Sequence, residues 1–357
     1  MAQQERVPHA LLFTEKSASG GLALAIAFAR RLLCTSPNAN DGCGNCSSCK
    51  QINQFAHPDL IFSFPIIKKD DVDNSETYGA QWRNALIENP FLDHDDWLVR
   101  MDGGSKLTLI GVAEASRLIR QCSLKRFNSR YRVVIIWLPE KMNITTANKL
   151  LKLLEEPAEG TLFFLVSRAP GQLLTTILSR CQLMPLLRTP ESALTPFLLQ
   201  HGATEERTAS VCARFSEGDI SQAIRLVRSD QSIERFADWF VRWTRICYAA
   251  KLNDLIDWSA ELHKATKDEL VAFLRFVASL FEESLRVKHD LMAFEHPAFQ
   301  RVEFKMKVFS NLMSQSALLH MRQELDEAVF AVQRNITPRL LLFHLGVQMM
   351  RSFKMKE

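Results

Sequence analysis

The 357-residue sequence lacks any run of about 18 or more apolar residues, the length that a membrane-spanning helix needs. Its start, MAQQERVPHALLF, also lacks the charged beginning, long apolar run and small-residue cleavage site of a secretory signal. Neither an internal repeat nor a low-complexity tract is present. We therefore expect a cytoplasmic protein that does not associate with a membrane.

A strong charge of one sign is also missing, because the formal net charge is only +4. Such a balance permits contact with DNA but does not require it. Hydrophobic residues make up 47% and charged residues 24% of the chain, which is ordinary for a globular protein. The length allows two or three domains.

Four of the eight cysteines crowd into one short segment, Cys34, Cys43, Cys46 and Cys49. Without an export signal, this crowding favours a metal over disulfides. Four thiolates are the set that a structural zinc ion prefers, and they leave no open position for a catalytic water. The alternatives are unrelated free thiols or a redox role.

The first half of the chain alternates strand-like and helix-like segments. A strong helix, with Asn143 as its N-cap and Pro157 after its end, lies between two continuous apolar runs. Such runs are typical of strands that are covered on both faces. This alternation predicts a doubly wound, parallel α/β sheet, with strands at residues 11–14, 59–65, 132–138 and 161–167.

Two regions depart from the alternation. Residues of about 66–108 are rich in charge and predict an inserted, partly exposed excursion anchored by Trp82, Phe91 and Trp97. After residue 187 the strand signals stop, and helical periodicity continues to the end, for example at 233–250 and 269–287. We expect an α/β domain at 1–187, with a zinc knuckle at 34–49, followed by helical domains at 188–230 and 231–357.

The turn after the first strand has the layout of a phosphate-binding loop without its functional residues. A working loop reads G-x-x-x-x-G-K-[ST], in which lysine neutralises phosphate and the hydroxyl holds Mg²⁺. Here Glu15, Gly20, Gly21 and Leu22 stand at the first glycine, second glycine, lysine and hydroxyl positions. The acidic pair expected at the end of the third strand is missing too, since Trp137, Leu138 and Pro139 stand there. No functional ATP site is expected.

Five segments, in order, resemble the clamp-loader branch of the AAA+ ATPases: VPHALLF, the cysteine knuckle, HPDL, KMNITTANKLLKLLEEP and LLTTILSRCQ. The resemblance covers roughly residues 7–190. Within this branch, the lost nucleotide motifs and the retained Ser-Arg-Cys resemble the delta-prime family of bacterial DNA polymerase III. The string WLPEKMN and the acidic excursion are most similar to delta-prime chains of Bacteroidetes type. By analogy of fold, residues 188–230 are expected to form a lid and 231–357 an oligomerisation collar.

This resemblance implies a subunit without enzymatic activity of its own, acting as a stator within a DNA polymerase holoenzyme. Its partners would be the gamma/tau and delta subunits, with the sliding clamp and primer-template DNA reached through the assembly. The family's arginine motif matches Ser179, Arg180 and Cys181. Arg180 would reach a neighbour's γ-phosphate in trans, so we expect its side chain to leave the domain surface.

Two other functions remain open. An ATP-hydrolysing gamma/tau-like motor would share the fold, but Gly21, Leu22 and Trp137 argue against it. A zinc-dependent DNA-binding module would explain the cysteines, but not the LLTTILSRCQ segment or the α/β pattern.

Overall fold

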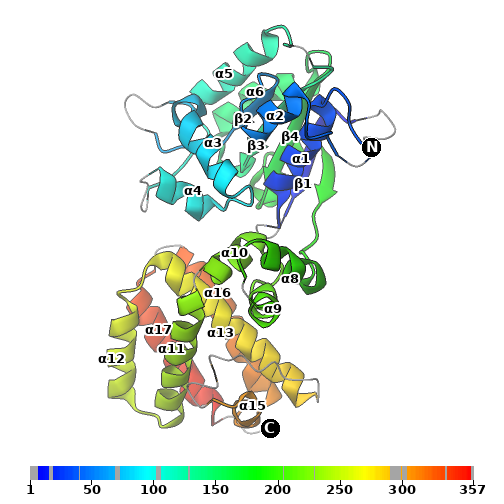
Figure 1. Ribbon diagram of the computed structural model, residues 1–357. Helices are drawn as coiled ribbons and strands as arrows, with labels where there is room; N and C mark the ends of the chain where they lie inside the picture. Colours follow the sequence, from blue (N-terminus) through cyan, green and yellow to red (C-terminus); the bar gives the residue numbers. More distant parts are fainter. Residues whose placement is uncertain are drawn as a thin grey trace. The chain divides into compact units, whose positions relative to one another are not determined.

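A computed structural model describes residues 7–15, 19–39, 41–68, 73–101, 106–127, 129–203, 205–228, 230–289, 299, 304–333 and 336–354. The chain divides into two compact units (Figure 1). The first comprises residues 1–190 and 217–221, and the second comprises 191–216 and 222–357.

The first unit is built on a parallel sheet of five strands in the order β2-β3-β4-β1-β5. The strands are β1 (Ala10–Thr14), β2 (Leu60–Ser63), β3 (Arg132–Trp137), β4 (Thr161–Ser167) and β5 (Gln182–Pro185). All residues of β3 and β4 are buried, as their continuous apolar sequences predict. The predicted parallel α/β sheet is therefore confirmed. The edge strand β5 was not predicted, because it is short and largely exposed and has no apolar run.

Helices cover both faces of this sheet, and each face has its own hydrophobic core. One face packs against α1 (Gly21–Leu33), α2 (Ser47–Asn53), α3 (Gly79–Glu88) and α4 (His94–Arg100). The other packs against α5 (Val112–Ser123), α6 (Ile144–Glu155) and α7 (Thr175–Leu178). Alternate residues of each strand point to opposite faces, so β1 places Phe13 in the first core and Leu12 in the second. Asn143 caps α6 as predicted, its side chain accepting a hydrogen bond from the Thr146 N–H.

The described residues of the predicted excursion at 66–108 are partly exposed and partly packed into the core, as expected. Residues 69–72 and 102–105 of this segment lie outside the described residues. Trp82 of α3 and Trp97 of α4 are 2% and 0% exposed, whereas Phe91 is half-buried. Trp82 stacks on Phe64, with ring centroids 4.0 Å apart, and contacts Trp137 at 5.3 Å. Trp82 and Trp97 anchor the segment, as predicted, within an aromatic cluster that extends the core.

In the second unit, every described regular element is a helix. The predicted helices at 233–250 and 269–287 are confirmed as α11 (Asp230–Tyr248) and α13 (Lys267–Lys288). The others are α8 (Glu191–Gln200), α9 (Glu206–Phe215), α10 (Ile220–Arg228, its first two residues in the first unit), α12 (Leu252–Leu262), α15 (Met306–Asn311), α16 (Gln315–Gln333) and α17 (Pro338–Ser352). Aromatic side chains form much of the core, with Trp243 and Trp258 stacked at 5.7 Å.

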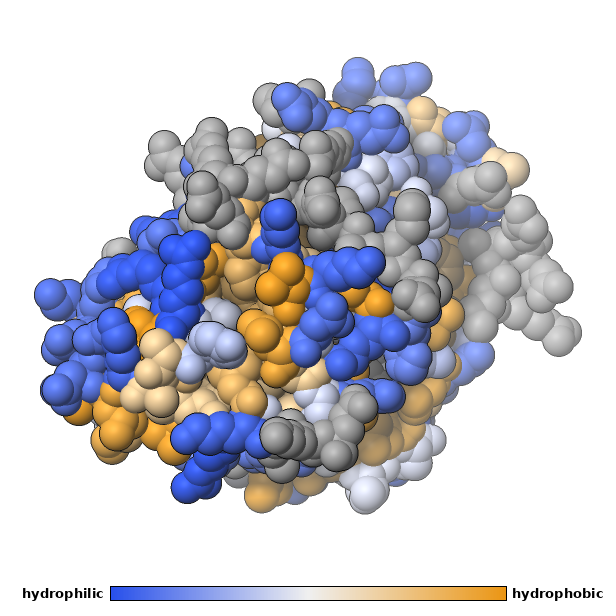
Figure 2. All heavy atoms as spheres, turned by 90° about the horizontal axis from the view of Figure 1, so that it is seen from below, coloured by the Kyte–Doolittle hydropathy of each residue, from blue (hydrophilic) through white to orange (hydrophobic). Residues whose placement is uncertain are grey.

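Two further observations concern the length of the helices and the surface of the molecule. None of the described helices combines the length and the apolar character that crossing a bilayer requires. Apolar side chains stand among charged ones on the face that Figure 2 shows.

Candidate functional site

The turn between β1 and α1 holds the four positions of the degenerate phosphate loop. Gly20 caps α1 in the left-handed conformation, at φ 93°, which glycine adopts readily. Gly21 and Leu22 begin the helix and are buried. A lysine and a hydroxyl would be needed at these two positions to bind phosphate and Mg²⁺.

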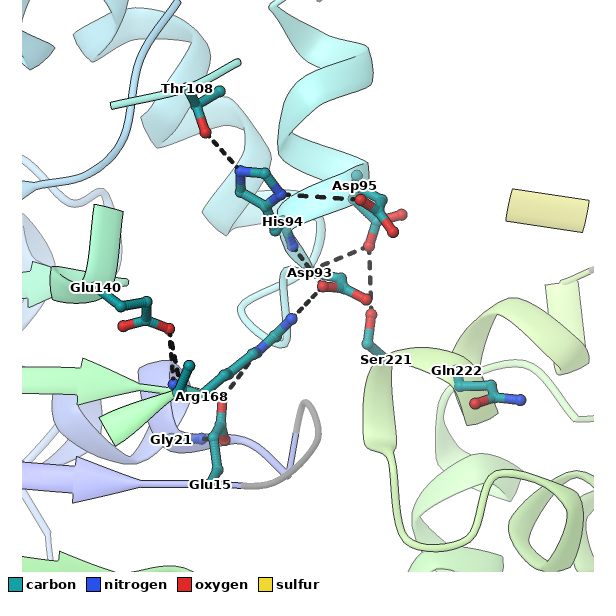
Figure 3. A network of polar contacts seen from close by, with 12 residues as sticks. Glu15, Gly21, Asp93, His94, Asp95, Thr108, Glu140, Arg168, Ser221 and Gln222 are labelled. Atoms are coloured by element: carbon teal, nitrogen blue, oxygen red, sulfur yellow. Dashed lines mark hydrogen bonds and ion pairs between the residues drawn. The ribbon is translucent and has the colours of Figure 1, made fainter. Parts of the chain in front are cut away.

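The carboxylate of Glu15 lies at this turn, next to the first residue of α1. Glu15 is 3% exposed, and its Oε2 accepts a hydrogen bond of 2.8 Å from the backbone N–H of Gly21. Its Oε1 lies 3.3 Å from Nε of Arg168, the residue directly after β4. Figure 3 shows Arg168 extended between Glu15 and Asp93, with which it forms a second ion pair. The turn that corresponds to the phosphate loop thus holds an internal network of charges.

The electrostatics of this network follow from its burial. Burial raises the pKa of Glu15, and the opposing effects of Arg168 and of the Gly21 N–H offset this only in part. For Arg168, burial lowers the pKa, but the carboxylates of Asp93 and Glu15 outweigh it and the net shift is upward. Arg168 is therefore a permanent cation between two carboxyl groups.

At the position of the second nucleotide motif, the chain has a buried apolar residue in place of a carboxylate. Trp137 at the end of β3 is fully buried against Trp82, where a motor protein would place a carboxylate. Leu138 follows at φ 55°, an uncommon conformation for a branched residue. Glu140 then turns back, and its Oε1 accepts hydrogen bonds from the backbone N–H groups of Arg168 at 2.9 Å and Ala169 at 3.2 Å. This carboxylate fixes the end of β4 and is directed at the protein's own backbone.

The four clustered cysteines come together at the C-terminal end of α1 and the start of α2. Their sulfur atoms all lie within 4.8 Å of one another, and Sγ of Cys34 is 3.8 Å from Sγ of Cys46. A tetrahedral zinc site with bonds of about 2.3 Å has edges of about 3.8 Å, so the spacing fits. Backbone N–H groups point at the sulfurs, for example from Cys43 to Cys34 at 3.2 Å and from Cys46 to Cys43 at 3.3 Å. The four thiols can hold a metal ion.

The protonation of these thiols depends on the same contacts. A hydrogen bond from the Cys49 N–H lowers the pKa of Cys46 to about 5, and one from the Cys46 N–H lowers that of Cys43. Burial raises the pKa of Cys49 to about 12. Backbone hydrogen bonds thus favour the thiolate forms of Cys43 and Cys46, whereas Cys49 needs a nearby cation to ionise.

Arg180 lies between α7 and β5, within the Ser-Arg-Cys segment. Its Nη2 is 3.1 Å from Oε2 of Glu155, and its Nη1 donates to the carbonyl of Thr176 at 2.9 Å. The side chain is 28% exposed, so it lies along the surface of the first unit. This corrects the expectation that the side chain leaves the surface: Glu155, at the end of α6, supplies an acceptor within reach.

The neighbours of Arg180 have different environments. Ser179 is exposed, and its hydroxyl donates to the carbonyl of Thr176 at 3.2 Å. Cys181 is buried in the core beside α6, and burial raises the pKa of its thiol to about 11. Cys181 is thus an inert packing residue that anchors the segment, while Arg180 before it lies along the surface.

Sequence reasoning missed Arg168, Asp93 and Glu155. One signal for Arg168 was present: it follows the carboxyl end of a buried parallel strand, the edge at which such sheets bind ligands. Asp93 and Glu155 gave no such signal, because their partners are 75 and 25 residues away in the chain.

Comparisons with known proteins agree with the motifs. The family model described as "DNA polymerase III, delta subunit" matches residues 1–190. The chain is 28% identical over 290 residues to the DNA polymerase III subunit delta' of Escherichia coli, covering 80% of this chain and 72% of that protein. It is 28% identical over 232 residues to the delta' subunit of Bacillus subtilis, covering 65% of this chain and 57% of that protein.

Two more distant similarities were also found. The tau subunit of Escherichia coli DNA polymerase III is 26% identical over 233 residues, which cover 64% of this chain and 30% of that protein. Among solved structures, a gamma subunit-related protein from Thermotoga maritima is 14% identical, with a TM-score of 0.40, and the match covers 98% of this chain and 96% of that one.

Proposed function

This chain belongs to the DNA polymerase III delta subunit family, and because the two relatives that it matches at 28% identity are delta' subunits, we propose that it is the non-catalytic delta' subunit of a clamp loader. In this role it contributes to DNA replication as a stator within the polymerase holoenzyme. It does not turn over ATP itself.

The observation that carries this proposal is the state of the nucleotide site. Gly21, Leu22 and Trp137 replace the three groups that bind phosphate and Mg²⁺, and Glu15 places a carboxylate at the start of α1. A negative charge there opposes the binding of any phosphate. An ATP-hydrolysing gamma/tau-like motor, the alternative function within this fold, needs all the groups that are missing here.

Arg180 supplies the part of ATP chemistry that remains. We propose that it acts in trans on the γ-phosphate of a neighbouring ATPase subunit, with Ser179 and Cys181 completing its motif. A planar guanidinium can contact two phosphate oxygens at once and stabilise the charge that develops during hydrolysis. The ion pair with Glu155 is exposed, and a surface pair of this kind is weak enough to exchange for a phosphate.

The metal ion is proposed to be zinc, held by Cys34, Cys43, Cys46 and Cys49. Zn²⁺ prefers four thiolates in structural sites, and a closed set of four leaves no position for catalysis. When bound, the ion fixes the loop between α1 and α2 and has no part in the arginine chemistry. Such sites contribute roughly 10–16 kcal/mol in isolated peptides, enough to order a short loop.

The helical part is proposed to divide into a lid at 188–230 and a collar at 231–357 that holds the subunits together. Large apolar side chains are exposed on α12, α16 and α17, including Leu252, Ile256, Leu319, Phe330 and Leu340. We propose that these side chains contact a partner subunit in the assembly. The proposed partners are the gamma/tau and delta subunits, with the sliding clamp and primer-template DNA reached through the assembly. Membership in the Bacteroidetes type and a cytoplasmic location remain part of the proposal.

Reconstitution tests the function directly. The purified chain would be mixed with gamma/tau and delta subunits of the same organism, and DNA-stimulated ATP hydrolysis and clamp loading would be measured. We expect both activities to require this chain, and the chain alone to show neither. An ATPase activity of the isolated chain that was lost with Gly20→Val would support the motor instead.

A further inference from the structure

The degenerate phosphate loop is still followed by a helix, α1, but a carboxylate of the protein itself lies at the start of that helix. The helix α1 begins at Gly21 with no side-chain cap from Gly20 and no acidic residue in its first turn. The first N–H groups of a helix have no partner within it and carry the positive end of its dipole, which favours an anion. In this chain the anion is present: Oε2 of Glu15 accepts the N–H of Gly21 at 2.8 Å.

A cation completes the arrangement on the other side of that carboxylate. Nε of Arg168 lies 3.3 Å from Oε1 of Glu15, while Nη1 pairs with Asp93 at the start of α4. The backbone N–H of Arg168 is fixed by Glu140. Figure 3 shows these groups converging on Arg168 from separate elements. A buried carboxylate needs such partners, because a charge removed from water is costly unless it is paired and hydrogen-bonded.

The steric fit links two departures from the working loop. A Cβ atom added to Gly21 would lie 2.9 Å from Oε2 of Glu15 and 3.0 Å from Cγ1 of Val166. Carbon and oxygen atoms do not approach so closely without displacement, so a side chain at residue 21 would have to move the Glu15 carboxylate and press on Val166. Glycine at the lysine position and glutamate at the first glycine position are therefore coupled.

We propose that the carboxylate of Glu15 is a built-in anion that takes the place of a nucleotide phosphate at the start of α1. Arg168 is its counter-cation, in the place of the missing lysine and metal. The first unit thereby holds β1, α1, α4 and the end of β4 in one arrangement without any nucleotide. An external phosphate is excluded because its position and its countercharge are both taken.

Removal of the tethered anion should open a site for a free one. In Glu15→Ala, the Gly21 N–H loses its acceptor, and Arg168 loses its ion pair with Glu15 while keeping that with Asp93. We expect the melting temperature of the full-length chain to fall, on the order of 10 °C. Inorganic pyrophosphate at millimolar concentration should then recover several degrees in this variant, and none in the wild type.

The controls separate this effect from general destabilisation. Glu156→Ala removes an exposed carboxylate from the same unit and should neither destabilise nor gain from pyrophosphate. Sodium chloride at matched ionic strength should not replace pyrophosphate. Glu15→Gln keeps an oxygen for the Gly21 N–H but loses the charge, so it should melt between the wild type and Glu15→Ala, and it serves in place of Glu15→Ala if that variant does not fold.

Two outcomes would overturn the assignment. One is an equal response of the wild type, Glu15→Ala and Glu156→Ala to pyrophosphate. The other is a melting temperature of Glu15→Gln equal to that of the wild type, because the charge would then have no role. The isolated chain is enough for these measurements, so their outcome is independent of Arg180 and of assembly with other subunits.

Discussion

Arg180 forms an ion pair with Glu155, Nη2 to Oε2 at 3.1 Å, on the surface of the first unit. The proposed trans arginine is therefore held by its own subunit when no neighbour is present. To reach a phosphate it must leave Glu155. Because such exposed pairs contribute only about 0.2–1 kcal/mol, the exchange is easy.

Replacement of the arginine should affect the assembly and not the fold. Arg180→Ala should lower the stability of the isolated chain by less than about 1 kcal/mol. In the reconstituted clamp loader, DNA-stimulated ATP hydrolysis should fall by about tenfold or more, since arginine fingers contribute about 10³–10⁵ in GTPases. Arg180→Lys should rescue poorly, because an ammonium cannot make the bidentate contact. Unchanged hydrolysis and unchanged loading with Arg180→Ala would leave the subunit a purely structural member of the assembly.

Removing the partner that holds Arg180 should have the opposite effect on ATP hydrolysis to removing Arg180 itself. Glu155→Gln removes the competing carboxylate, so ATP hydrolysis by the complex should stay the same or rise by up to about fivefold, the equivalent of 1 kcal/mol. Glu156→Gln, one residue further on and also exposed, is the matched control and should change nothing. If Glu155→Gln instead lost as much activity as Arg180→Ala, Glu155 would be needed to orient the arginine.

The metal site predicts a stoichiometry and a pH dependence. The purified chain should contain one zinc ion, and Cys43→Ser should reduce this strongly, while Cys122→Ala should not, because Cys122 is a residue of α5 that faces the core. Zinc binds the thiolates, so protons compete with it and zinc held against a chelator should decrease as the pH falls. Elemental analysis checks each value. A zinc content well below one per wild-type chain at neutral pH would contradict the assignment.

Restoring a lysine to the phosphate loop should not restore ATP binding. The wild-type chain should show no ATP binding of micromolar affinity by calorimetry. Gly21→Lys should not create it, and should destabilise the chain by about 1–3 kcal/mol, because the new Cβ meets Glu15 and Val166. Gly171→Lys is the control, since a Cβ there meets nothing within 4 Å. Micromolar ATP binding by either the wild type or Gly21→Lys would show that the site is open.

The sequence predicted the parts of this molecule that depend on local pattern. The buried strands β3 and β4, the helix α6 with its Asn143 cap, and the convergence of four cysteines all follow from periodicity or spacing. These features need only neighbours in the chain, and the residue types themselves specify them.

The contacts that fill the nucleotide site could not be predicted in the same way. Glu15 and Arg168 are 153 residues apart, and only the pairing of β1 with β4 brings them together. Glu15 suggested repulsion of phosphate, but nothing local indicated that its carboxylate would itself accept the Gly21 N–H. The insertion illustrates the same limit: Trp82 was predicted as an anchor, but its contacts with Phe64 and Trp137 follow from the fold.

Assembly should depend on the exposed apolar residues of the second unit. Phe330 on α16 and Leu340 on α17 are 64% and 68% exposed. Phe330→Glu and Leu340→Glu should weaken co-purification with gamma/tau and delta subunits, because a charge would replace apolar area in the proposed collar contact. Since both side chains already face solvent, the stability of the isolated chain should change by less than about 0.5 kcal/mol.

The matched control is Leu107→Glu, which introduces the same charge at an apolar side chain that is 89% exposed on the first unit. It should assemble as the wild type does. A chain ending at Arg228, before α11, should fail to assemble even though it retains Arg180 and the cysteine cluster. Size-exclusion chromatography of the mixed subunits measures all four variants. Normal assembly of the shortened chain, or of both second-unit variants, would place the constitutive contacts elsewhere, because the collar residues would then be dispensable.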